Sequence, residues 1–176
     1  MISRHSRKGF SLVELVVVIA LMGILLSLAV PAFQDWIAKS AVESQVKQIV
    51  TDISEVRIRA LTMKRRHSIT FKAYSAVFRM YSSETYSSDS DMKSNGTPVL
   101  GGTRAYRFGL GKNSSGSSMY SGDVREIDER GVNVGLEATI FMIGAGTANA
   151  RPNCFTLHAI RVNAGKSNSS GGCDDI

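Results

Sequence analysis

One carboxylate stands out because of the residues around it. Glu14 lies in the stretch KGFSLVELVVVIALMGILLSLAVPAF, residues 8–33, and none of the 19 residues from 15 to 33 is charged. A carboxylate in the middle of a membrane span costs about 2.5–3.5 kcal/mol on insertion scales. A buried anion is far less costly when it is paired with a cation. We therefore expect Glu14 to have a partner of opposite charge.

The two cysteines of the chain, Cys154 and Cys173, lie 19 positions apart near the C-terminus. The sequence has no CxxC pair and no cluster of Cys and His with the spacing of zinc ligands. Basic residues precede the apolar stretch, and by the positive-inside bias we expect the part that follows the stretch to be exported. In an exported domain one disulfide is favoured over two free thiols. Closing a loop of this length would contribute about 3 kcal/mol to stability.

Basic residues are concentrated at two places. The formal net charge is +6, and Arg4, Arg7 and Lys8 precede the apolar stretch with no acidic residue among the first nine. The run Lys64-Arg65-Arg66-His67 is typical of a solvated helix C-terminus, where cations complement the helix dipole. The alternative is a contact surface for nucleic acid or a protein partner, with residues from three segments: Lys64, Arg65, Arg66, Arg161 and Lys166. Nucleic acid is possible but not favoured, because aromatic residues are not interleaved with these cations.

No residue pattern of an enzyme or a metal site is present in the sequence. The histidines are scattered, and neither Gly-x-Ser-x-Gly nor HExxH occurs. Asp89, Asp91, Asp174 and Asp175 could ligate calcium, but their spacing matches no EF-hand loop. We therefore predict no enzymatic activity, no cofactor and no metal.

The apolar stretch continues into an amphipathic helix. From residue 34 to about 64, apolar residues recur at steps of three and four, which indicates one buried stripe. The simplest prediction is a single helix of some 50 residues. Pro31 lies where its character changes and should kink or loosen it.

The remaining residues predict strands and long loops. Residues 68–73, 77–82, 105–108, 139–143 and 155–162 are predicted strands. Residues 82–103 and 111–123 are predicted loops, and DVREIDER (123–130) is predicted as a solvated turn or short helix. The expected fold class is α+β, a long N-terminal helix packed on a small antiparallel sheet.

Three interpretations compete for the N-terminal stretch. A secretory signal peptide cleaved after Ala29 is disfavoured by Glu14 and by the smooth continuation into the amphipathic helix. A passive membrane anchor explains the length of the stretch and the basic residues before it, but not the carboxylate.

The third interpretation is a resemblance. KGFSLVELVVVIALMGILL resembles the prepilin signature of type IV pilins and type II secretion pseudopilins. The resemblance implies cleavage between Gly9 and Phe10 by a prepilin peptidase that also methylates Phe10. It also assigns assembly roles to Glu14 and Pro31. A free amine at Phe10 would be the cation that Glu14 requires, within its own helix or on a neighbouring subunit.

The resemblance also implies the pilin-like architecture, the location and the partners. Residues 1–9 would be the leader, 10–33 the transmembrane and assembly helix, 34–67 its amphipathic continuation and 68–176 a β-rich globular domain. The chain would cross the bacterial inner membrane once, with that domain in the periplasm. Its partners would be other pilins or pseudopilins in a filament, the prepilin peptidase and the membrane.

A second resemblance concerns the globular part. RALTMKRRHSITF (59–71) and ATIFMIGAGTANARPNCFTLHAIRV (138–162) resemble the H-type minor pseudopilins and the FimT/FimU-type minor pilins. It implies a minor subunit at or near the filament tip that promotes protein secretion or pilus assembly. DNA-binding members of that group carry closely spaced arginines in the last turn, where this chain reads Gly165-Lys166-Ser167-Asn168. The alternatives are a DNA-binding minor pilin for natural transformation and an anchored periplasmic binding domain that stays monomeric.

Overall fold

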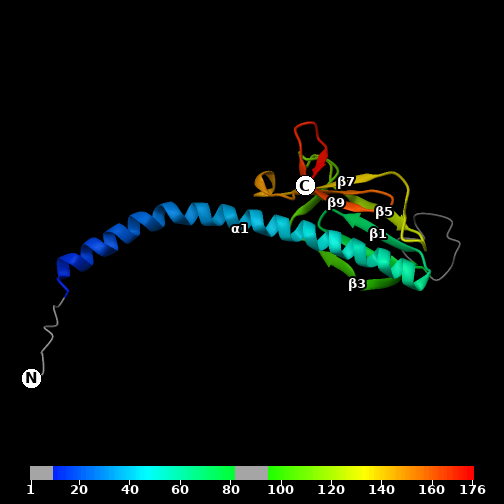
Figure 1. Ribbon diagram of the computed structural model, residues 1–176, viewed down its shortest axis with the longest axis horizontal. Coiled ribbons are helices and arrows are strands. Elements are labelled where there is room, and N and C mark those ends of the chain that lie inside the picture. The colour runs from blue at the N-terminus through cyan, green and yellow to red at the C-terminus, as the bar shows by residue number, and fades with distance from the viewer. Residues whose placement is uncertain (1–9, 82–94) are drawn as a thin grey trace, which may run out of the picture. The chain divides into compact units, whose positions relative to one another are not determined.

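The computed structural model describes residues 10–81 and 95–176 and divides the chain into two compact units, Met1–Ile37 and Ala38–Ile176. Helix α1 (Leu12–Met63) begins in the first unit and continues into the second (Figure 1). The second unit also contains ten strands. The strands are β1 (His67–Lys72), β2 (Ser75–Met80), β3 (Thr97–Ala105), β4 (Gly109–Gly111), β5 (Ser121–Ile127), β6 (Asn133–Val134), β7 (Ala138–Ile143), β8 (Cys154–Leu157), β9 (Val162–Ser167) and β10 (Cys173–Asp175). A short 3-10 helix, η1 (Thr147–Asn149), lies between β7 and β8.

The single long helix predicted from the sequence is confirmed: α1 has 52 residues. It is continuous through Pro31, which has no N–H to donate to the preceding turn. It ends at Met63 because Lys64 adopts a φ of 51°, the left-handed conformation that often follows a helix. The α+β fold class is also confirmed, with the helix packed on antiparallel sheets.

The strands form two five-stranded antiparallel sheets rather than one small sheet. Their strand orders are β3-β2-β1-β5-β6 and β10-β9-β8-β7-β4. In the first sheet β1 pairs with both β2 and β5, so Thr70 lies opposite Val77 on one side and Val124 on the other. In the second sheet β8 pairs with β7 and β9.

The core of the second unit lies where the helix meets the sheets. Apolar residues of α1 recur at steps of three and four and have no exposed surface: Val42, Val46, Ile49, Ile53, Val56 and Ala60. The same cluster includes Phe71 and Phe78 of the first sheet and Phe155 of the second. Burying an apolar side chain of this size contributes about 1.5–3 kcal/mol. This stripe therefore fixes the second half of the helix to the sheets.

Several sequence predictions of loops and strand limits are wrong. Residues 97–103, predicted as loop, belong to β3, whereas the strand predicted at 105–108 is absent because β3 ends at Ala105 and β4 begins at Gly109. β5 covers 121–127, so DVREIDER is largely a strand rather than a turn or short helix. The strand predicted over 155–162 is two strands, β8 and β9, joined by a turn in which the His158 N–H donates to the Arg161 carbonyl. Residues 82–94 of the predicted long loop lie outside the described residues.

The missed strands share a physical explanation. Each of these strands contains residues of low strand propensity: a proline and two glycines in β3, an asparagine and a glycine in β9, and two aspartates in β10. Pairing along a neighbouring strand satisfies their backbone groups whatever their side chains are. Their composition therefore resembles a loop although their backbone belongs to a sheet.

Candidate functional site

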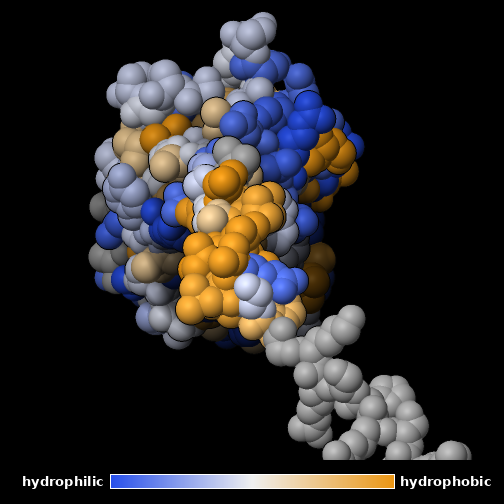
Figure 2. Space-filling model, turned by 90° about the vertical axis from the view of Figure 1, so that its left-hand side faces the viewer, coloured by the Kyte–Doolittle hydropathy of each residue, from blue (hydrophilic) through white to orange (hydrophobic). Residues whose placement is uncertain are grey.

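The first unit consists, in its described part, of an exposed apolar helix. Phe10 is 74% exposed, Leu12 78% and Leu25 67%, and the other large apolar side chains described between residues 13 and 37 are exposed as well. Figure 2 shows apolar side chains covering the surface of this segment that faces the viewer. Within the described chain, α1 is the one helix long and apolar enough to cross a membrane, by length and composition. Such a surface has no partner among the described residues.

Glu14 interrupts this surface at its start. It lies in the first turn of α1, whose first backbone hydrogen bond runs from the Leu15 N–H to the Ser11 carbonyl at 3.2 Å. A carboxylate in this turn is favoured by the partial positive charge of the helix N-terminus. Among the described residues, the carboxylate of Glu14 makes neither a hydrogen bond nor an ion pair. The structure describes the chain from Phe10 onward, so Gly9 lies outside the described residues.

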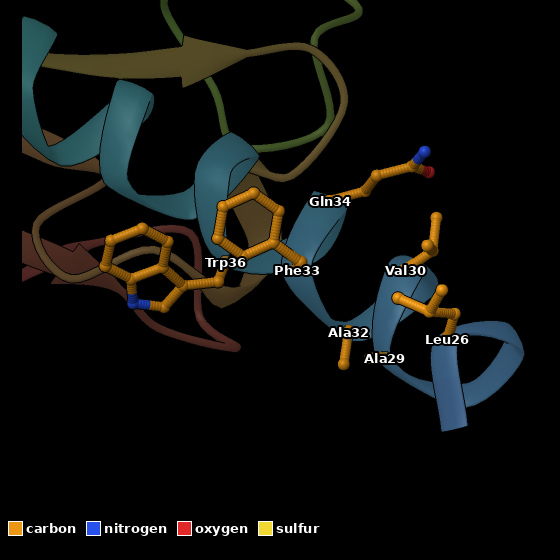
Figure 3. A pocket seen from close by; sticks show the side chains of 7 residues that line it. All are labelled: Leu26, Ala29, Val30, Ala32, Phe33, Gln34 and Trp36. Atoms are coloured by element: carbon orange, nitrogen blue, oxygen red, sulfur yellow. The ribbon is translucent and has the colours of Figure 1, made fainter. Parts of the chain in front are cut away.

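An apolar groove marks the other end of the exposed segment. It has a volume of about 670 Å³ and is lined by seven residues of α1: Leu26, Ala29, Val30, Ala32, Phe33, Gln34 and Trp36 (Figure 3). The small alanines leave a hollow between larger side chains, and the Phe33 and Trp36 rings stack with centroids 6.0 Å apart. A hollow between ridges is the shape into which a side chain of another helix packs. Pro31, predicted to act in assembly, lies within the segment that forms this groove but does not line it.

The disulfide predicted between Cys154 and Cys173 is present. It ties β10 to β8, with β9 between them in the sheet. Gly165 of β9 lies directly below this bridge, because a Cβ added there would meet the Asp174 carbonyl oxygen and Cys173 Sγ. The C-terminal residues therefore form the edge of the second sheet.

The predicted basic residues do not form one surface. Arg66 Nη1 lies 3.2 Å from Glu126 Oε1, which joins the end of the helix to β5. The Lys166 ammonium instead donates hydrogen bonds to the carbonyls of Ala148 and Ala150, around η1. Burial, and after it the positive charges of Arg151 and Lys39, lower the pKa of Lys166. Lys39 precedes Lys64 by 25 residues, or about 38 Å of helix.

Arg161 lies at a third position, where its carbonyl faces Arg57 of α1. The candidates for nucleic-acid contact thus occupy three places: Lys64, Arg65 and Arg66 at the end of the helix, Arg161 along it, and Lys166 near its entry into the second unit. A single phosphate-binding track would require them to be contiguous.

Sequence reasoning missed the buried polar residues of α1 that position the sheets. Gln45 donates through Nε2 to the Phe108 carbonyl at 3.0 Å and accepts from the Phe108 N–H at 2.9 Å. Arg57 Nη2 donates to the His158 carbonyl at 2.9 Å, which holds the turn after β8 against the helix. These residues flank the apolar stripe, and a polar residue beside such a stripe is the signal that could have identified them.

Asp52 is a further buried polar residue of α1. The residue is 6% exposed, and its Oδ2 lies 3.8 Å from Arg104 Nε of β3. Burial raises the pKa of the Asp52 carboxyl, partly offset by the charge of Arg104. The pair connects α1 to an edge strand that the sequence assigned to a loop.

Comparison with known proteins matches part of the chain. The family model of the prokaryotic N-terminal methylation motif matches residues 4–30. Fimbrial protein Q of Moraxella bovis is 56% identical over 36 residues, which are 20% of this chain and 23% of that protein. The type IV major fimbrial protein FimA of Dichelobacter nodosus is 39% identical over 51 residues, 29% of this chain and 30% of that protein.

A fimbrial protein of Pseudomonas aeruginosa is 38% identical over 55 residues, 31% of this chain and 33% of that protein. The chain therefore covers about a quarter to a third of the length of these relatives. No solved structure matches. The predicted resemblance to the type IV pilin-like family is confirmed, and it rests on the apolar segment that begins beside Glu14.

Proposed function

We propose that this chain is a structural subunit of a type IV pilus or a type II secretion pseudopilus. The observation that carries the proposal is the coincidence of two features in one segment. The methylation motif covers residues 4–30, and the described apolar side chains of this segment are exposed along the helix. A surface of this size is stable in lipid or against other apolar helices, and not in water. A subunit that moves from membrane to filament meets both environments.

We assign processing and assembly roles to individual residues, and the match to the methylation motif supports this assignment. Cleavage between Gly9 and Phe10 would release an amine four residues before Glu14, and methylation would follow on Phe10. The absence of a partner for Glu14 among the described residues is consistent with a partner on another subunit, the Phe10 amine of a neighbour. Pairing across subunits would fix the axial register of the helices, because a slip leaves both charges buried alone.

We propose further that the subunit is a minor one, at or near the filament tip. This assignment rests on the likeness of residues 59–71 and 138–162 to the H-type minor pseudopilins and FimT/FimU-type minor pilins. The relatives found by comparison are fimbrial proteins, some of them named as major subunits, and they match 20–29% of this chain. The basic tip before the apolar segment orients the chain with its second unit in the periplasm by the positive-inside bias.

The mature N-terminus tests the proposal against a monomeric anchored domain. The chain is extracted from inner membranes and its intact mass is measured, with peptide sequencing of the first residues. The expected product begins at Phe10 and carries one methyl group on its amine. A chain that keeps Met1, or one cleaved after Ala29, contradicts the proposal. Comparing the copy number of the processed chain with that of the major subunit then tests the minor role.

A further inference from the structure

A polar pocket lies on the face of the first sheet that points away from the core. Ile69 and Phe71 of β1 are fully buried in the core, so Thr70 and Lys72 project from the opposite face. The pocket has a volume of about 230 Å³. Its lining comes from three adjacent strands: Thr70 and Lys72 of β1, Val77 and Arg79 of β2, and Ser121 and Gly122 of β5.

The floor of the pocket holds an unsatisfied hydroxyl group. Thr70 is 4% exposed, and its Oγ1 is buried with no hydrogen-bond partner among the described residues. Threonine in the middle of a sheet ordinarily finds such a partner, because leaving a buried hydroxyl unpaired costs about 1–3 kcal/mol. The hydroxyl can donate a hydrogen bond to an acceptor that enters the pocket.

A cation stands at the rim of the pocket. Lys72 is exposed at its rim and has no carboxylate within ion-pair distance among the described residues. Arg79 lies on the opposite side, where its Nη1 donates to the Gly96 carbonyl at 2.9 Å. An anion that enters the pocket would meet the ammonium of Lys72.

The acidic residues of the neighbouring strand β5 have other partners. Asp123 Oδ1 lies 2.8 Å from the Lys112 ammonium, and its Oδ2 accepts from the Ser121 N–H at 3.4 Å. Glu126 is paired with Arg66. Neither residue lines the pocket. The space above Gly122 is also open, since a Cβ built there has no atom within 4 Å.

We propose that this pocket binds the carboxylate of an acidic side chain of another protein. The ammonium of Lys72 supplies the charge, the Thr70 hydroxyl donates to a carboxylate oxygen, and Val77 packs against the methylene groups of the incoming side chain. Charge-assisted hydrogen bonds of this kind are about twice as strong as neutral ones. The pocket lies wholly within the second unit and does not depend on the proposed role of the first.

The lining favours a carboxylate over a nucleotide. Proteins that bind single-stranded nucleic acid stack bases on aromatic side chains, and no aromatic residue lines this pocket. A volume of about 230 Å³ accommodates one side chain. The apolar surface of Val77 suits methylene groups rather than a sugar-phosphate chain.

Methyl NMR of the full chain in detergent micelles tests the proposal. The threonine and valine methyl groups are labelled with carbon-13, and the resonances of Thr70 and Val77 are followed during titration with N-acetylglutamate amide. The expected result is a saturable shift of both resonances. The neutral analogue, N-acetylglutamine amide, is expected to shift neither.

Two variants identify the groups responsible. Lys72→Gln removes an exposed charge, and Thr70→Val removes the hydroxyl while keeping the shape of the side chain. Each is expected to weaken binding about fivefold or more. Lys47→Gln, at an exposed position of α1, is the matched control and should leave the affinity unchanged. Unchanged methyl resonances elsewhere establish that each variant is folded.

Several outcomes would overturn the proposal. They are no saturable shift, an equal shift with the glutamine analogue, or full affinity in both Lys72→Gln and Thr70→Val. A single-stranded oligonucleotide or inorganic phosphate that shifts these resonances at lower concentration than the glutamate probe would assign the pocket to phosphate instead. None of these outcomes bears on the mature N-terminus, so the pocket and the assembly role fail independently.

Discussion

The two halves of α1 have the same backbone and opposite surroundings. In residues 12–37 the described large apolar side chains are exposed around the helix, whereas from Val42 to Ala60 one apolar stripe is fully buried against the sheets. The second half thus finds its apolar partner within the chain, and the described part of the first half does not. Because apolar surface of that extent is unstable in water, the first half requires lipid or other helices. The halves differ in where their partners come from, and each prediction below tests that difference.

The largest effect on stability is expected from Ile53 in the buried stripe. Ile53→Ala removes a fully buried side chain and leaves a cavity, so the free energy of unfolding of the second unit should fall by about 4 kcal/mol. Ile19→Ala is the matched control, because it makes the same change on the exposed half of the same helix. It should alter the unfolding free energy by less than about 0.5 kcal/mol.

Pulse proteolysis of the detergent-solubilised chain across a urea series measures both values. Equal losses for Ile53→Ala and Ile19→Ala would remove the distinction between the halves.

The disulfide should affect only the second unit. Replacing both Cys154 and Cys173 by alanine removes the loop constraint and should lower the unfolding free energy by about 3 kcal/mol. Insertion of the first unit into the membrane should not change. Urea unfolding with and without reductant provides the measurement, and carbonate extraction of membranes provides the control. An unfolding midpoint that is insensitive to reductant would contradict this prediction.

A smaller effect is expected from Gln45, which binds the backbone of Phe108 with both ends of its amide. Gln45→Ala leaves a buried N–H and a buried carbonyl without partners and should cost about 2 kcal/mol. Gln48→Ala is the control, since Gln48 lies on the exposed face of the same turn. The urea unfolding midpoints of Gln45→Ala and Gln48→Ala measure the two losses of stability. A loss of similar size in Gln48→Ala would show that helix propensity, and not the Phe108 contact, is responsible.

The sequence predicted the local features of the molecule better than the contacts between distant residues. The period of the apolar residues and the motif around Glu14 gave the helix and the family, because both are local signals. Cys154 and Cys173 gave the disulfide because they were the one possible pair. β3, β9 and β10 could not be predicted, since their polar residues become strands only when a neighbouring strand pairs with them. Gln45 and Asp52 were missed because their partners, Phe108 and Arg104, lie more than 50 residues away.

The smallest effect should come from His67 and should depend on pH. Its ring is fully buried, with Nδ1 2.9 Å from the Arg65 carbonyl and no partner for Nε2 among the described residues. Burial lowers the pKa of His67 below its ordinary value of 6.5, with the Arg65 hydrogen bond opposing and the charge of Arg59 reinforcing the shift. Below pH 6.5 the unfolded state therefore binds more protons than the folded state.

The folded chain should consequently lose stability as pH falls from 6.5 toward the lowered pKa of His67, and regain it above. Urea unfolding at a series of pH values measures this slope in the parent chain and in His67→Gln. The difference between the two slopes is the contribution of His67. Parallel slopes would contradict the prediction, and Ile19→Ala should retain the slope of the parent chain.

The central claim is that the first half of α1 completes its packing on other subunits and that Glu14 directs this step. The most direct measurement is the fraction of Glu14→Ala chain found in sheared filaments, relative to processed chain left in the membrane. Glu55→Ala, which removes a carboxylate from the exposed surface of the second half, is the matched control. We predict that Glu14→Ala is processed and stays in the membrane while Glu55→Ala enters filaments as the parent chain does. Normal incorporation of Glu14→Ala would contradict the account.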